Sequence, residues 1–168
     1  MLVAHVAIVF LVKLLAPGLD LFFLLLGTSV SGFDAILPIL GLRDDEYHCG
    51  GIFHSVWPPV LAALMLVPLG LSASLSFLAG GILHLLADST DERGRPWLHP
   101  LIEKSYGLAV FPYDFRDYVS NPVCVITEIL SAIFVFWYVW AFALDIQSIL
   151  LLCLLIPLFG AFVLHQLD

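Results

Sequence analysis

Charged residues are scarce in this chain, and positively charged residues are the scarcest. Of its 168 residues only 6 are Lys or Arg, against 14 Asp or Glu, which gives a formal net charge of −8. Such an acidic chain is poorly suited to nucleic acid, whose phosphates need cationic partners. The three cysteines, Cys49, Cys124 and Cys153, show no CxxC spacing and give no sign of a disulfide framework. No basic segment precedes the first apolar run, whose first Lys is Lys13, so a mature helix is expected there and not a cleaved signal peptide.

Apolar residues are correspondingly abundant. They make up 61% of the chain, and the mean hydropathy is +1.05. Soluble proteins are usually closer to half apolar, so the composition predicts an integral membrane protein with one domain over residues 1–168. The expected fold is an all-α, polytopic membrane helical bundle of about six apolar helices, drawn from the runs 2–16, 19–31, 56–69, 72–88, 122–144 and 148–164. The first two runs are shorter than the roughly 20 residues of a comfortable span, which favours a short helical hairpin.

The fourth run ends on two side chains that bind metals. His84 and Asp88 are four residues apart, so on a helix they lie on the same face, one turn from each other. An imidazole and a carboxylate in this arrangement can hold one divalent cation. Ionisable groups at the end of a membrane-compatible run are costly and usually functional. A solvated pair at the membrane surface is the structural alternative.

The other polar residues are expected to gather at the same end of the bundle. Six spans would place both termini and the loops 43–54 and 89–121 on one side of the membrane. The metal-capable side chains near that face are His5, Asp34, His48, His54, His84, Asp88 and Glu128. Asp20 would lie at the opposite end and is left out of the site. Nearly all of the Lys and Arg residues share the His-rich face, so the positive-inside rule predicts that it is cytoplasmic, on the inner face of a cell membrane.

These residues, in this order, resemble the family of membrane-bound metal-dependent hydrolases (YdjM-type inner-membrane hydrolases), distant relatives of zinc-dependent phospholipase C. The family has an early His, a Pro-Asp-x-Asp, a His-Arg-Gly-x-Thr-His-Ser segment and a Gly-x-x-x-His-x-x-x-Asp helix end followed by Gly and Pro. The matching positions, over roughly residues 1–130, are His5, Asp34, Gly51, His54, Ser55, Gly80, His84, Asp88, Gly94 and Pro100.

The chain also departs from the family pattern. Gly32 stands where the first Asp of Pro-Asp-x-Asp would be, which puts one metal contact in doubt. His48-Cys49-Gly50-Gly51 replaces His-Arg-Gly with one extra residue, and Phe53 replaces the usual Thr. Glu128 falls in a region where the family is variable.

The candidate residues and the resemblance together predict a metal-dependent hydrolase. Seven candidate ligands exceed one four-coordinate ion, so two ions are expected, Zn²⁺ first and Mn²⁺ or Mg²⁺ as alternatives. Asp34 or Glu128 would serve as the catalytic base, and Arg93 and Arg95 would contact a substrate phosphate. The substrate class, a phosphoester of a lipid-like or membrane-associated molecule, is implied by the kinship to phospholipase C. The alternatives are a metal-binding membrane transporter and an interaction protein that retains a degenerate site.

Overall fold

A computed structural model describes residues 2–30, 52–90, 94–108, 121–142, 145–150 and 152–153. Within these residues the chain is helical, and there is no strand; the nearest approach to a sheet is one antiparallel bridge between Arg95 and Tyr106. The elements are α1 (Leu2–Leu15), α2 (Leu21–Val30), η3 (Ile52–His54), α4 (Trp57–Leu66), η4 (Val67–Leu69), α5 (Leu71–Asp88) and α6 (Pro122–Ala141). Residues 146–150 and 152–153 are also helical. The all-α prediction is confirmed.

The helix ends follow local signals in the sequence. Between α1 and α2 the Pro17-Gly18 pair interrupts the helix, and the Lys13 ammonium donates hydrogen bonds to the Pro17 and Leu19 carbonyls. Asp20 accepts a hydrogen bond from the Phe23 backbone N–H and so caps the start of α2. This capping role agrees with its exclusion from the predicted site.

The later helices also begin and end at local signals in the sequence. Prolines in the first turn mark the start of α4 and of α6. Asn121 caps α6, because its side-chain oxygen accepts hydrogen bonds from the Val123 and Cys124 backbone N–H groups. Gly70, with φ of +121°, makes the tight turn into α5. Beyond α6, Ser148 donates hydrogen bonds from its backbone and its hydroxyl to Asp145, and these hydrogen bonds lower the pKa of Asp145.

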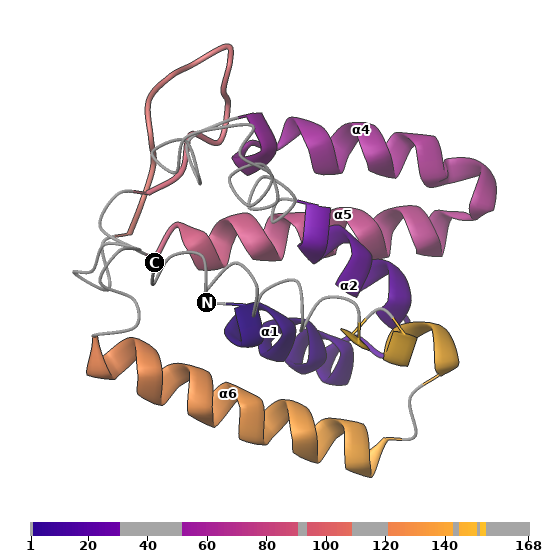
Figure 1. Cartoon of the computed structure of the whole chain (residues 1–168). Helices are drawn as coiled ribbons and strands as arrows, with labels where there is room; N and C mark the ends of the chain where they lie inside the picture. Colours follow the sequence, from indigo (N-terminus) through magenta and orange to yellow (C-terminus); the bar gives the residue numbers. More distant parts are fainter. Residues whose placement is uncertain are drawn as a thin grey trace.

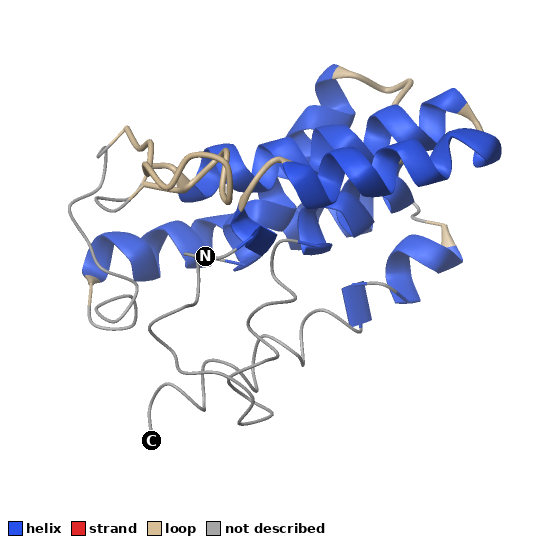
Figure 2. Ribbon diagram, turned by 90° about the horizontal axis from the view of Figure 1, so that it is seen from above, coloured by secondary structure: helices blue, strands red, loops and turns tan. Residues whose placement is uncertain are grey.

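Most of the helices lie roughly along one direction, and helices far apart in the sequence pack side by side (Figures 1 and 2). Helix α5 packs against α2 and α4, and α1 packs against α6 and α2. Around α1 the buried core contains Phe10 and Leu24, and the Phe10 ring stacks on Tyr138 of α6 with 4.3 Å between ring centroids. Since α1 contacts both α5 and α6, it connects the α2–α4–α5 group to the last helices.

Helices α2 and α5 approach so closely that glycine is needed at their contact. A Cβ on Gly27 would lie 2.0 Å from the Phe77 carbonyl oxygen, and a Cβ on Gly80 would lie 2.1 Å from that of Leu24. The Thr28 hydroxyl donates a hydrogen bond of 2.8 Å to the Gly80 carbonyl across this contact. This interface fixes α5, the helix that carries His84 and Asp88, against its neighbour.

In the described part of the chain, α5 and α6 are long and apolar enough to cross a membrane. Helices α1, α2 and α4 are apolar but shorter. Only 11% of α6 is buried inside the structure, and large apolar side chains such as Ile133, Phe136 and Trp140 are exposed along it. A non-aqueous surrounding would be the natural environment for such a surface.

One end of the molecule contains the start of α1, the end of α5 and the start of α6 (left in Figure 1). Residues 94–108 lie at the same end. Helix α4 also begins there, directly after η3. For these elements, the predicted gathering of polar segments at one end is the observed arrangement.

Candidate metal centre

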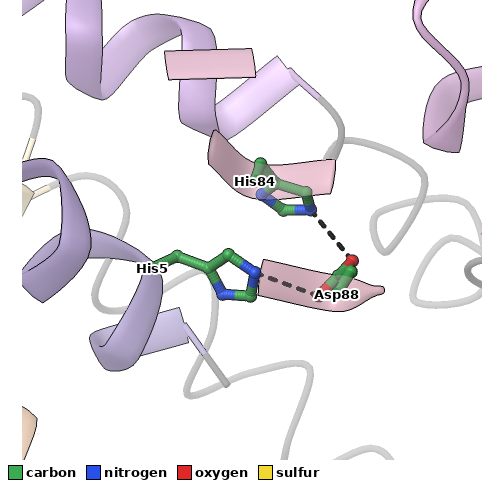
Figure 3. Close-up of side chains that lie close together, drawn as sticks. All are labelled: His5, His84 and Asp88. Atoms are coloured by element: carbon green, nitrogen blue, oxygen red, sulfur yellow. Dashed lines mark ion pairs between the residues drawn. The ribbon is translucent and has the colours of Figure 1, made fainter. Parts of the chain in front are cut away.

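Three histidines from three separate elements converge on one carboxylate. His5 lies on α1, His54 ends η3, and His84 lies one turn before Asp88 at the end of α5. His5, His84 and Asp88 point toward one another, with the Asp88 carboxylate facing both imidazole rings (Figure 3). His5 and His84 are separated by about half of the chain, so the fold and not the local sequence brings them together.

The contacts with Asp88 are short and use both of its oxygens. His5 Nε2 lies 3.0 Å from Oδ1. His54 Nε2 and His84 Nε2 each lie 3.2 Å from Oδ2. The His84 ring stacks on that of His5 at 4.3 Å between centroids and lies 5.5 Å from that of His54. Each histidine therefore directs the same type of nitrogen, Nε2, at the same carboxylate.

The cluster is largely shielded from solvent. His54 is 1% exposed, and His5 and His84 are 6% exposed each, whereas 13% of the Asp88 side chain is accessible. Imidazole and carboxylate groups buried to this degree need partners, either one another or a cation. Among the described residues, the Asp88 side chain is thus the most accessible member of the cluster.

Local structure explains how these side chains come to point inward. On α5 the spacing of four residues places His84 and Asp88 on one face, as predicted. The Ser55 hydroxyl donates a hydrogen bond of 2.6 Å to the Ile52 carbonyl, and this closes the short turn that carries His54. Helix α4 begins directly afterwards at Trp57.

The donor set and the distances fit a divalent metal. One ligand atom each from His5, His84 and Asp88 lie within 4.8 Å of one another. Zinc with nitrogen and oxygen ligands at about 2.0–2.2 Å in a tetrahedron would separate its ligand atoms by roughly 3.3–3.6 Å. The His5 and His84 contacts with Asp88, at 3.0 and 3.2 Å to different carboxylate oxygens, lie just below this range.

A second observation also fits a cation. Neither ring nitrogen of His84 makes a hydrogen bond of acceptable geometry to a described residue, although Nε2 lies 3.2 Å from Asp88 Oδ2. A buried imidazole without a hydrogen bond is energetically costly, and a metal bond to Nε2 would give that nitrogen a partner. His54 contacts the same carboxylate, but it lies outside the group formed by His5, His84 and Asp88.

Arg95 contacts the same carboxylate oxygen as His54 and His84, a contact that the sequence did not predict. Its Nε is 3.4 Å from Asp88 Oδ2, its terminal nitrogen donates to the Gly94 carbonyl at 2.7 Å, and the residue is 4% exposed. The sequence suggested a phosphate contact for Arg95, and the structure places the guanidinium at Asp88. An Asp–Arg separation of seven residues across a turn carries no periodic signal that would have revealed this pair.

The remaining predicted residues have different outcomes. Asp34, His48 and Arg93 lie outside the described residues, so their predicted roles stay predictions. Glu128 is partly buried on α6 and lies outside the group formed by His5, His84 and Asp88. Its predicted role as a ligand or catalytic base also stays a prediction.

Comparison of the chain with protein-family models, with curated proteins and with solved structures gave no match. The geometry of the cluster and the composition of the chain therefore carry the functional interpretation.

Proposed function

We propose that this chain is an integral membrane metal-dependent hydrolase that cleaves a phosphoester of a lipid-like or membrane-associated substrate. The single observation that carries the proposal is the convergence of the buried His5, His54 and His84 on the Asp88 carboxylate at 3.0–3.2 Å. The resemblance to membrane-bound metal-dependent hydrolases supports the same reaction class.

His5, His84 and Asp88 would hold the metal, and His54, which contacts the same carboxylate, would be a further ligand. Zinc is the first candidate, with manganese or magnesium as alternatives. A bound divalent ion supplies Lewis acidity and a water of lowered pKa. His5, His54 and His84 contribute neutral nitrogen ligands, and Asp88 contributes charge. Arg95, whose Nε lies 3.4 Å from Asp88 Oδ2, would help to orient the carboxylate. A second ion would need further ligands, for which Asp34, His48 and Glu128 are the candidates from the sequence.

The proposed site lies at the membrane surface. The cluster forms at the ends of helices, where α5 stops and α6 starts (Figure 1), and α5 and α6 are the two described helices suited to cross a bilayer. A site at this depth suits a substrate whose apolar part remains in the lipid. We further propose a multi-pass arrangement in a cell membrane with the cluster on the cytoplasmic face, on the basis of the positive loops.

The position of the cluster also bears on the alternative functions. Transporters place substrate and ion sites near the bilayer midplane at broken helices. A cluster at helix ends favours a surface-facing enzyme. An interaction protein with a degenerate site is favoured by Gly32, which stands where the resembled family has a carboxylate.

Elemental analysis of the protein purified in detergent tests the proposal. We expect close to one or two equivalents of zinc or manganese in the wild type, and loss of the ion in His84→Ala and Asp88→Asn. His99→Ala is the matched control, because His99 lies near the same end of the molecule and outside the cluster. Metal-loaded wild type should then hydrolyse a chromogenic phosphodiester, whereas Asp88→Asn should not. A wild type that takes up no metal after reloading would rule out the proposal.

A further inference from the structure

Residues 94–97, here called the brace, lie across the segments that carry the metal-site residues. The brace is held at Arg95, whose backbone N–H and carbonyl pair with those of Tyr106 at 2.9 and 2.8 Å. Gly94 adopts φ of +65°, and a Cβ there would lie 2.6 Å from the Tyr106 carbonyl group, so glycine is required. Beyond the brace, the Leu108 N–H donates a hydrogen bond of 2.7 Å to the Ser89 carbonyl. The brace is thus a defined element of the fold.

Trp97, the last residue of the brace, bonds to both sides of the cluster. Its indole Nε1–H donates a hydrogen bond of 2.8 Å to the Ser89 hydroxyl, and Ser89 directly follows Asp88. Its backbone carbonyl accepts a hydrogen bond of 2.9 Å from the Val56 N–H, two residues after His54. One residue therefore connects the end of α5 to the turn that carries His54.

His54 needs such a connection more than the other members of the cluster do. His84 and Asp88 are fixed to each other by a single helix, and His5 lies within α1, which packs against α5. His54 lies at the end of a three-residue helix, 30 positions away from His84 in the chain. A short turn of this kind has little rigidity of its own. Its distance to Asp88 depends on α4, which begins at Trp57 and packs against α5, and on the hydrogen bonds that Trp97 makes to Val56 and Ser89.

We propose that Trp97 is a positioning residue that sets the place of His54 relative to His84 and Asp88. The inference rests on the proposed metal centre. Groups that orient metal ligands without touching the metal typically change metal affinity by about 10–100-fold when removed. The indole N–H bonds the brace directly to Ser89. Its loss would remove the restraint that links the Trp97 carbonyl, and with it the turn at Val56 and His54, to the end of α5.

Trp97→Phe keeps an aromatic ring and the backbone carbonyl but removes the N–H donor together with part of the indole ring, so it is paired with a variant that removes only the acceptor of the same hydrogen bond. We expect zinc affinity, measured by competition with a chromogenic chelator in detergent, to fall about 10-fold. Ser89→Ala, which removes the acceptor, should reproduce the loss. Trp140→Phe is the matched control, because Trp140 is 80% exposed on α6, and it should bind zinc as the wild type does.

A double-mutant cycle distinguishes positioning from a general loss of structure. In a His54→Ala background there is no imidazole left to position, so adding Trp97→Phe should cause no further loss of zinc affinity. In a His5→Ala background the roughly 10-fold loss should persist. Cobalt-substituted protein gives an independent readout, because the visible spectrum of Trp97→Phe should approach that of His54→Ala.

The outcomes separate this inference from the proposed function. Zinc binding by the wild type with no change in Trp97→Phe, or an equal loss with and without His54, would overturn the positioning role alone. A wild type that binds no zinc would overturn both proposals. Circular dichroism of each variant establishes that the affinities compare folded proteins.

Discussion

Gly80→Ala should loosen the contact between α2 and α5 that supports the cluster. The added Cβ would lie 2.1 Å from the Leu24 carbonyl oxygen, and ordinary contact begins at 3.4 Å. The helices would therefore have to separate by about 1.3 Å at this point. The obstructing atoms belong to the backbone of α2, so no side-chain rotation can relieve the clash.

The size of the effect follows from three contributions. Overpacking of a tight contact costs about 1–3 kcal/mol. The Thr28–Gly80 hydrogen bond, at 2.8 Å in the wild type, would be stretched beyond range, at a cost of about 1 kcal/mol. The higher helix propensity of Ala returns about 1 kcal/mol. The net destabilisation is about 1–3 kcal/mol, which corresponds to a fall in melting temperature of roughly 5 °C for a chain of this size.

Thermal unfolding in detergent, followed by the helical circular dichroism signal, measures this change. Gly18→Ala is the matched control, because no atom lies within 4 Å of a Cβ at Gly18 and its φ is not in the left-handed region. It should leave the melting temperature within a degree or two of the wild type. A Gly80→Ala variant that melts at or above the wild-type temperature would refute the close backbone contact between α2 and α5.

Two further predictions follow from the helix ends and from the donor set. Asn121→Ala should destabilise the protein by about 1 kcal/mol in the same unfolding assay, because it removes the side-chain cap of α6, and Asn121→Asp should restore the loss; equal stability of all three proteins would exclude the cap. Zinc affinity should fall as the pH is lowered, because protons compete with the metal for the imidazole nitrogens. Chelator competition at decreasing pH, down to the limit at which circular dichroism shows the protein to be folded, measures the effect, and an affinity that does not change over that whole range would mean that the imidazoles are not the ligands.

Much of the helical framework could be predicted from local sequence. The Pro17-Gly18 break, the Pro58-Pro59 start, the turn at Gly70 and the end of the fourth run at Asp88 are each features of the structure. Proline and glycine restrict the backbone directly, so their effect needs no tertiary context. The pairing of His84 with Asp88 was predictable for the same reason, since helical periodicity alone places them together.

The contacts between distant segments depended on the tertiary structure. Alternating helix direction predicted that His5 and His54 would be near the same end as His84, but it did not predict that all three rings would meet at one carboxylate within 3.2 Å. The Arg95–Asp88 and Trp97–Ser89 contacts had no signal in the sequence, because both form across an irregular turn whose path is set by the Arg95–Tyr106 pairing.

The sequence by itself determined an apolar, helical chain with metal-capable side chains at helix ends, because composition and periodicity act within a few residues. Which of those side chains share one carboxylate was decided only by packing. The glycine contact between α2 and α5, the position of α1 against α5 and the brace that ties His54 to the end of α5 fix distances between segments that lie tens of residues apart. Such distances depend on how whole helices pack against one another, and no local sequence pattern predicts them.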